Sequence, residues 1–290
     1  MFDFITVVFQ VELPLLEIQA RSLDLYIKPQ DVNQIVIVVN DNDYVADMID
    51  TTWWGQHSNK VVIKTTSNYD LLGTGWENQQ VLKLIAASEA TTTWSLVLDA
   101  KTWFIKPFES DKLFGTNGKP WVGSVPGLPN VFVQARAFVE QYYNIQMPKI
   151  LGPNGVPYLF HTSSVKEMID SIDDFIGFFR SNTQGPNFLT EFFLYSGFLI
   201  SKYGSLEELH NTTHCYLFPF NLATNEISND NDIFTKLRRY PKSILTASIH
   251  RNAYSKLSPE QLETWYNFLV ERQLFPSLIE TQKLLNTYIK

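Results

Sequence analysis

A carboxylate and a cation follow an apolar run in this chain, in the order Leu98, Asp99, Ala100, Lys101. The run from Trp94 to Leu98 has the short, continuous apolar pattern of a strand buried in a parallel sheet. Ligands of open α/β sheets bind beyond the carboxyl ends of the strands, so Asp99 and Lys101 stand where they could contact a ligand. A turn or capping aspartate after a strand is an equally good explanation of Asp99 alone.

The segment before this strand has the spacing of an amphipathic helix. At roughly 100° per residue, Val81, Leu82 and Ile85 share one face. The other face combines an aromatic ring, two amides and an ammonium group, namely Trp76, Gln79, Gln80 and Lys83. Thr74 and Glu77 have capping-box spacing at its start. Such a polar face suits a polyhydroxylated or phosphorylated ligand, so we expect Trp76 and Asp99 to face one cavity.

Polar residues also follow two earlier strands that the sequence predicts. Phe4–Phe9 is followed by Gln10 and Glu12, and the strand over residues 34–39 is followed by Asn40 to Asp43. If the strands are parallel, these ends lie along one edge of the sheet and line a common cleft. Turn chemistry explains Asp41 and Asp43 equally well.

Two further residues have both a functional and a structural explanation. Glu191 lies among aromatic residues at the start of a predicted helix over 188–203, where an apolar setting favours a general base. A first-turn acid that complements the helix dipole is the alternative. His161 ends a short predicted strand, and a half-buried histidine satisfied by its neighbours is its better explanation.

Strands and helices alternate up to Asp99, which predicts a βαβαβαβ arrangement with right-handed crossovers. Beyond it we expect helices over 131–143, 165–180 and 188–203, a strand over 244–249, and two closing helices, the first capped by Ser258. The fold class is therefore α/β, a mostly parallel sheet flanked by helices with a helical C-terminal tail. We expect residues 1–225 to form the ligand-binding domain and 226–290 to pack on it as a helical extension.

Composition narrows the function. The chain has 290 residues, 44% of them hydrophobic and 18% charged, which is typical of a globular protein. A formal net charge of -7 and the lack of a long basic run argue against a nucleic-acid partner. Cys215 is the only cysteine, which excludes an internal disulfide and a cysteine-based zinc site. Without a signal-peptide pattern or a run long enough for a transmembrane segment, we expect a cytoplasmic protein.

Several enzyme classes lack their motifs. No Gly-x-Gly-x-x-Gly follows the first strand, and no Gly-rich loop precedes a Lys-Ser or Lys-Thr pair, which disfavours dehydrogenases and P-loop enzymes. No Gly-x-Ser-x-Gly elbow supports an α/β-hydrolase.

The order of elements resembles that of GT-A nucleotide-sugar glycosyltransferases, which have a Rossmann-like nucleotide-binding half. Two segments are similar to a group of bacterial and phage proteins of formerly unknown function. The first runs from Gly75 to Leu84 and contains Trp76, Gln79, Gln80 and Lys83, and the second runs from Leu96 to Pro107. Weaker similarity extends to 158–161, 190–195 and 248–251. The resemblance is specific only from 73 to 108, and it implies a bacterial cell or a phage-infected host.

The resemblance also implies roles for individual residues. It places Gln10 and Asp41 near the nucleoside, and Trp76, Gln79, Gln80 and Lys83 at the donor sugar and diphosphate. Asp99 would orient the ribose, the sugar or a cation. Glu191 would deprotonate the acceptor hydroxyl in an inverting reaction, or only orient the acceptor in a retaining one. Arg21 on the first helix is either a phosphate contact or a surface charge.

Glycosyltransferases of this kind have an Asp-x-Asp motif that binds a divalent cation bridging the donor diphosphate. Mn²⁺ and Mg²⁺ prefer carboxylate and phosphate oxygens. Here Lys101 replaces the second acid. Metal could bind weakly through Asp99 and His250, or Lys101, Lys83 or Arg21 could neutralise the leaving group without metal. We expect weak or absent metal dependence.

The sequence thus predicts an enzyme that moves a sugar from a nucleotide diphosphate donor to a hydroxyl of a glycan or similar acceptor. A binding protein on a decayed transferase fold is the alternative, because Lys101 departs from the motif. A nucleotidylyltransferase is disfavoured, since no Gly-rich, cationic loop follows Phe9.

Overall fold

The fold is built on a five-stranded sheet. The computed structural model describes residues 1–69, 75–122, 130–148, 156–183, 186–212, 220–222 and 245–289. The strand order is β3-β2-β1-β4-β6, and only β6 runs antiparallel to its neighbour. The strands are β1 (Phe2–Val8), β2 (Val32–Val39), β3 (Val61–Thr65), β4 (Trp94–Asp99) and β6 (Tyr158–His161). The predicted mostly parallel α/β sheet is confirmed.

Alternate side chains of β1 reach two different cores, as the period of a strand requires. Ile5 and Val7 pack with the helices on one face, whereas Phe4 and Val8 pack with those on the other. Apolar residues on both sides of each central strand are thereby buried, which explains the uninterrupted apolar runs in the sequence.

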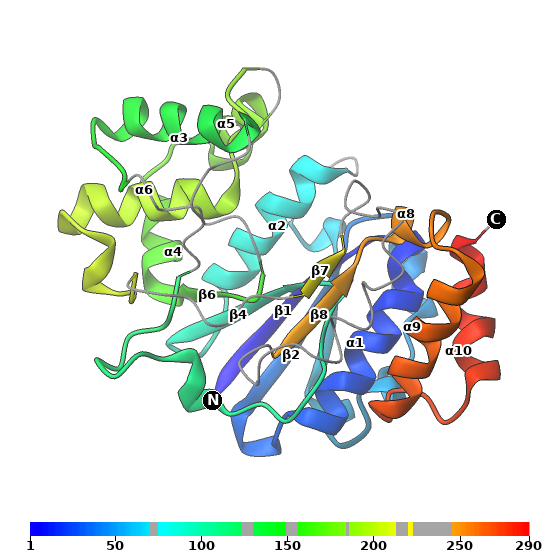
Figure 1. Ribbon diagram of the computed structural model, residues 1–290. Coiled ribbons are helices and arrows are strands. Elements are labelled where there is room, and N and C mark those ends of the chain that lie inside the picture. The colour runs from blue at the N-terminus through cyan, green and yellow to red at the C-terminus, as the bar shows by residue number, and fades with distance from the viewer. Residues whose placement is uncertain are drawn as a thin grey trace.

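Helices cover both faces of the sheet (Figure 1). On one face α2 (Trp76–Ser88) lies between the sheet and a group of helices: α3 (Asn130–Tyr143), α4 (Thr162–Asp170), α5 (Phe175–Thr183) and α6 (Glu191–Tyr203). On the other face lie α1 (Leu13–Tyr26), α9 (Pro259–Glu271) and α10 (Leu278–Leu285).

Three details of the expected elements are corrected. Two 3₁₀ segments, Asp43–Met48 and Thr51–Lys60, replace the expected helix between β2 and β3, because Trp54 and His57 are buried there in turns. The single helix expected over 165–180 is two helices, since Asp174 adopts a positive φ of 44° between α4 and α5. A second, three-stranded sheet was not expected, apart from its strand β8.

The C-terminal residues contribute β8 to this second sheet and then form the last three α-helices, α8 to α10, of the described residues. Its order is β5-β8-β7, with β5 (Thr102–Phe104), β7 (Phe220–Leu222) and β8 (Thr246–Ile249). The short helix α8 (Arg251–Tyr254) follows β8, and α9 begins with the predicted capping box of Ser258 and Gln261. Trp265 and Phe268 of α9 share one core with Leu15 and Ile18 of α1. The C-terminal helices therefore pack on the N-terminal half.

Some predictions fall on residues that the structure does not describe. Thr74, Cys215 and the proposed domain boundary at 225/226 lie outside the described residues. Among the described residues, every helix is too short or too polar to act as a membrane span.

Candidate active site

A cavity of about 410 Å³ opens beyond the carboxyl ends of β1 and β4. Six separate parts of the chain meet there: the segment between β1 and α1, α2, the end of β4, α3, the start of α6, and the segment after β8. The lining side chains are mostly polar or aromatic: Phe9, Glu12, Trp76, Gln79, Gln80, Lys83, Asp99, Lys101, Phe132, Thr190, Glu191, Phe192, His250 and Arg251. Trp76 and Asp99 thus face one cavity, as expected.

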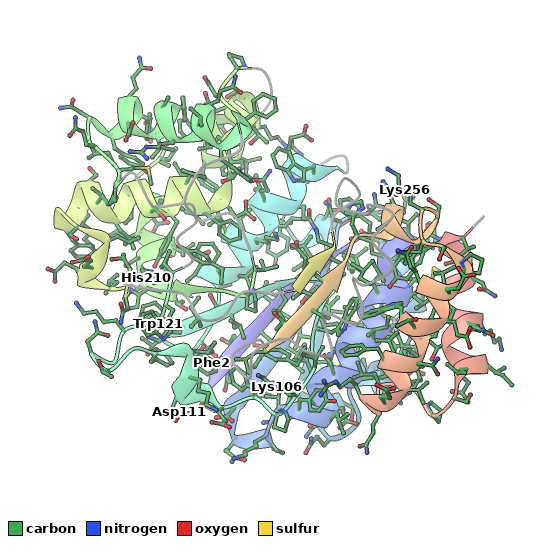
Figure 2. All side chains as sticks on the ribbon, viewed as in Figure 1. Phe2, Lys106, Asp111, Trp121, His210 and Lys256 are labelled. Carbon is green, nitrogen blue, oxygen red and sulfur yellow. The ribbon has the colours of Figure 1, made fainter. Side chains whose placement is uncertain are left out.

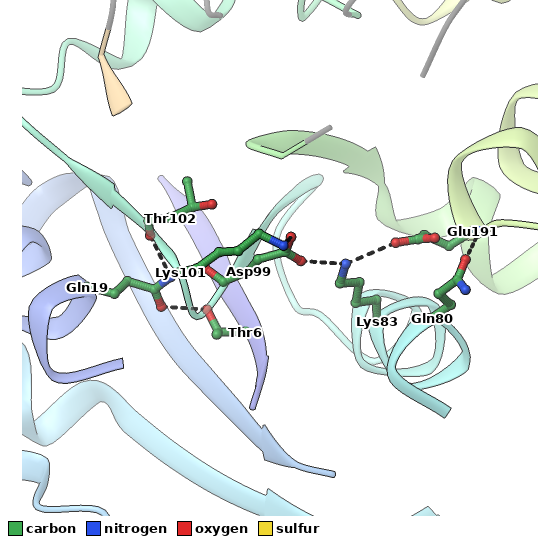
Figure 3. Close-up of polar contacts among 8 residues, drawn as sticks. All are labelled: Thr6, Gln19, Gln80, Lys83, Asp99, Lys101, Thr102 and Glu191. Carbon is green, nitrogen blue, oxygen red and sulfur yellow. Dashed lines mark hydrogen bonds and ion pairs between the residues drawn. The ribbon is translucent and has the colours of Figure 1, made fainter. Parts of the chain in front are cut away.

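Lys83 lies at the centre of the polar contacts and bridges two elements (Figure 3). Its Nζ donates to Asp99 Oδ1 at 2.7 Å and to Glu191 Oε1 at 3.0 Å. Burial disfavours the ammonium form, but the two carboxylates outweigh this and raise the pKa of Lys83. Lys83 therefore fixes the end of β4 relative to the start of α6.

The Asp99 carboxylate is held by two lysines. Besides Lys83, the Lys101 ammonium lies 3.1 Å from Asp99 Oδ2. Burial opposes ionisation of Asp99, yet Lys101 and Lys83 together hold its pKa well below the ordinary range. Asp99 is consequently a carboxylate at neutral pH.

The backbone around Asp99 is fixed from the opposite side by Gln19 of α1. Its buried amide donates to the carbonyls of Asp99 at 2.7 Å and Thr102 at 2.8 Å. Its oxygen accepts from Thr6 Oγ1 of β1 at 2.8 Å. Figure 3 shows these contacts continuing the chain of bonds that includes Lys83 and Glu191. The Gln19 side chain thus links α1 to β1 through its oxygen and to the end of β4 through its amide nitrogen.

Glu12, His250 and Arg251 form the opposite wall. Arg251 Nη1 donates to Glu12 Oε1 at 2.6 Å. Burial raises the pKa of Glu12, and Arg251 opposes that shift. Burial, with the positive charges of Lys101 and Arg251 adding to it, lowers the pKa of His250 to about 4. His250 is therefore a neutral imidazole at pH 7.

Two buried polar atoms of the lining residues have no hydrogen-bond partner within the described part of the chain: Gln80 Nε2 and Thr190 Oγ1. Gln80 is fixed by its oxygen, which accepts from the Glu191 backbone N–H at 3.4 Å. Buried polar atoms without partners are costly, so a ligand that supplies hydroxyl or phosphate oxygens would satisfy them.

The start of α2 presents the aromatic part of the cavity. Gly75 precedes the helix with a φ of 121°, which favours glycine, and its carbonyl accepts from the buried Asn40 side chain at 2.8 Å. Trp76 follows directly and is 48% exposed. An exposed indole next to Gln79 offers a flat surface for a sugar or a base.

The donor set around Asp99 does not suit Mn²⁺ or Mg²⁺, the ions considered for weak binding through Asp99 and His250. Both oxygens of Asp99 already bind lysines, and a divalent cation there would lie close to two ammonium groups. His250 Nδ1 accepts from the Asn252 N–H at 3.2 Å. No group of three or more His, Cys, Asp or Glu residues suited to a metal exists among the described residues. Metal ligation by Asp99 and His250 stays a prediction, and the two lysines paired with Asp99 weigh against it.

The lining of this cavity does not include five of the residues singled out from the sequence: Gln10, Arg21, Asp41, Asp43 and His161. Gln10 and Asp41 contact each other, the Gln10 backbone N–H donating to Asp41 Oδ2 at 3.1 Å. Arg21 pairs with Glu17 at 2.8 Å and covers the Phe275 ring, which matches its explanation as a surface charge. His161 bonds Ser164 at 2.9 Å and packs against Trp94. In Figure 2, His210, which also packs against Trp94, lies on the opposite side of the molecule from Lys256.

Two polar lining residues were not singled out from the sequence: Thr190 and Arg251. Thr190 precedes Glu191 and faces the cavity because the helix starts there. Arg251 follows β8, and its pairing with Glu12 spans 239 residues. The only available signal was that a cation follows His250 at the end of a predicted strand.

Comparison with known proteins gives one family and several distant structures. Residues 9–229 match a family described as "Family of unknown function (DUF6492)". No curated protein matches the sequence. Similar structures include the galactosyltransferase LgtC with donor and acceptor sugar analogues, at 10% identity and a TM-score of 0.47, covering 99% of this chain and 96% of that one.

Two other similar structures are longer proteins. The apo-form glycosyltransferase GlyE of Streptococcus pneumoniae TIGR4 matches at 10% identity and a TM-score of 0.47, over 99% of this chain and 62% of GlyE. The bifunctional glycosyltransferase WbbM matches at 10% identity and a TM-score of 0.45, over 95% of this chain and 51% of WbbM. At these values, function has to be argued from the cavity of this chain.

Proposed function

We propose a function for this chain, which belongs to the family of unknown function DUF6492, from the contents of its cavity. The protein is a glycosyltransferase that moves a sugar from a nucleotide diphosphate donor to a hydroxyl of a glycan or similar acceptor. The observation that supports this best is that Trp76, the Gln80 amide, Asp99 and Glu191 all line one cavity beyond the strand ends.

The lining chemistry suits a polyhydroxylated, charged ligand. Trp76 offers a flat apolar surface, and the unpartnered Gln80 Nε2 and Thr190 Oγ1 can bond sugar hydroxyls. Lys101 and Arg251 bring cations to the same space. A purely apolar ligand would leave these groups desolvated without partners.

In the proposed reaction, the bond between the sugar C1 and the diphosphate oxygen breaks, and a bond between C1 and the acceptor oxygen forms. The electron pair of the broken bond leaves with the nucleoside diphosphate. The acceptor proton goes to the Glu191 carboxylate if the configuration inverts, or to the departing diphosphate if it is retained. Glu191 then acts as base in the first case and only orients the acceptor in the second.

Lys83 and Asp99 have supporting roles in this proposal. Asp99 accepts hydrogen bonds from the ribose or the donor sugar, and Lys83 keeps it and Glu191 at fixed positions. Because the donor set does not fit a divalent cation, we propose weak or no metal dependence. A cytoplasmic setting belongs to the same proposal.

A binding protein without turnover is the second candidate. The observation that favours it is that Lys101 stands in place of the second acid of the Asp-x-Asp motif and pairs with Asp99 at 3.1 Å. Binding without release of nucleoside diphosphate, across many donors and acceptors, would support this candidate over the transferase.

The experiment is an assay of nucleoside diphosphate release from a panel of nucleotide sugars, with mono- and oligosaccharide acceptors and mass analysis of the products. The wild-type protein should release diphosphate from at least one donor, and Glu191→Gln should release far less. Absence of release and of glycosylated product for every donor, from protein that binds the donors, would refute the transferase.

A further inference from the structure

We infer that Lys101 and Arg251 form a metal-free subsite for the donor diphosphate, and that Glu12 competes with the diphosphate for Arg251. The inference rests on the proposed function and names the groups that hold the leaving group. It concerns the segment after β8, which lies beyond the residues 9–229 that match the family.

The two cations line the same cavity from different elements. Lys101 follows β4, and Arg251 begins α8 after β8. Their side chains are 26% and 31% exposed, so neither is sealed from a ligand. The neutral imidazole of His250 lies beside Arg251 in the chain, so it adds no charge to this wall at pH 7.

Both cations have hydrogen-bond donors to spare. Arg251 bonds Glu12 through Nη1, and a guanidinium has five N–H donors. Lys101 contacts only Asp99 Oδ2 within the described residues, and an ammonium has three donors. Phosphate oxygens accept such charge-assisted bonds, and arginine can bind them in a bidentate manner.

Lys83 is unsuited to the same task. Its side chain is 5% exposed and already bonds two carboxylates, so a phosphate would have to displace one of them. Breaking a buried ion pair is strongly unfavourable. The charge of the leaving group therefore falls to Lys101 and Arg251.

Glu12 acts as a competitor because its carboxylate occupies the guanidinium. The lining cations Lys83, Lys101 and Arg251 are balanced by Glu12, Asp99 and Glu191. A diphosphate that approaches Arg251 meets this nearby negative charge. Removal of the Glu12 charge should therefore strengthen diphosphate binding. If Glu12 only supported the structure, its removal would not strengthen binding.

The test is calorimetric titration of the full chain with inorganic pyrophosphate and with uridine, guanosine and adenosine diphosphates, in EDTA and again with Mn²⁺. In EDTA the wild-type protein should bind at least one of these diphosphates. Lys101→Ala should weaken binding by about tenfold or more, as loss of a charge-assisted bond implies. Glu12→Gln should tighten it by roughly threefold or more.

Arg251 needs a paired design, since Arg251→Gln alone strands the buried Glu12 carboxylate. The double variant Glu12→Gln/Arg251→Gln keeps a neutral pair and should bind about tenfold or more weakly than Glu12→Gln. Lys112→Ala is the control, because Lys112 is exposed and pairs only with Glu109 among the described residues.

Three results would overturn the inference: binding of diphosphates only in Mn²⁺, no binding of any diphosphate, or affinities that Lys101→Ala and Glu12→Gln leave unchanged. These results differ from failure of the proposed function. Diphosphate binding in EDTA without any sugar transfer would retain the subsite and refute the transferase.

Discussion

Replacement of Lys83 by methionine tests the central ion-pair cluster of the cavity. Methionine keeps most of the apolar length and removes the ammonium that lies 2.7 Å from Asp99 and 3.0 Å from Glu191. Loss of one partner from a buried ion pair typically costs about 3–5 kcal/mol, because an uncompensated charge stays buried. We expect the free energy of unfolding of Lys83→Met to fall by about that amount.

Urea unfolding followed by tryptophan fluorescence and circular dichroism measures this loss, with the slope checked for two-state behaviour. Asp99, whose pKa is depressed, contributes stability above its ordinary pKa of 3.8, and this is lost as the pH falls through its folded pKa. Lys83, whose pKa is raised, contributes below its ordinary pKa of 10.5. Between these limits the ion pairs contribute a constant amount to the free energy of unfolding of the wild-type protein. The loss of stability in Lys83→Met should shrink on acidification, because Asp99 and Glu191 then take up protons.

The control is the triple variant Lys83→Met/Asp99→Asn/Glu191→Gln, which leaves no buried charge unpaired, since Lys101, which loses its Asp99 partner, is 26% exposed. It should recover much of the lost stability, since neutral replacements of buried ion pairs are often tolerated. A loss below about 0.5 kcal/mol for Lys83→Met, or a triple variant less stable than the single one, would refute the reasoning.

Three further predictions concern other parts of the site. If the reaction inverts, Glu191→Gln should keep donor affinity within about threefold, measured by titration, while the rate of transfer, measured by product release, falls by about 100-fold or more. An equal loss of donor affinity and transfer rate would contradict the role of Glu191 as a base. Gln19→Leu leaves the carbonyl of Asp99 unpaired and should cost about 1–3 kcal/mol in urea unfolding, and an unchanged midpoint would contradict its positioning role. The pKa of His250, about 4, should rise in Arg251→Ala when followed by NMR titration, and an ordinary value in the wild-type protein would contradict the packing around it.

The part of the site that could be predicted from sequence depends on local periodicity. The spacing of Trp76, Gln79, Gln80 and Lys83 fixes one helix face, and the apolar run of β4 fixes where Asp99 stands. Parallel pairing of β1 with β4 then brings the start of α1 and Asp99 to one edge of the sheet. Each of these steps uses neighbours along the chain or one rule of sheet topology.

The remaining features depend on contacts between distant segments. The sequence predicts Lys83 to contact the sugar donor. Only the tertiary structure shows that its ammonium is already paired with Asp99 and Glu191. Arg251 joins the cavity through Glu12 across 239 residues, which no local pattern reports. Between β2 and β3, two 3₁₀ segments stand where a helix was expected, and the second of them buries Trp54.

The most direct test of the proposed donor site is a thermal-shift screen of nucleoside diphosphates and nucleotide sugars, with and without Mn²⁺. A ligand at a hundredfold excess over its Kd stabilises the folded protein by about 2.7 kcal/mol. We predict that at least one donor raises the Tm of the wild-type protein, and that Trp76→Ala and Lys101→Ala reduce this rise while Lys112→Ala does not. A panel in which no ligand raises the Tm, or a rise that neither cavity substitution alters, would contradict the claim that this cavity binds a nucleotide sugar.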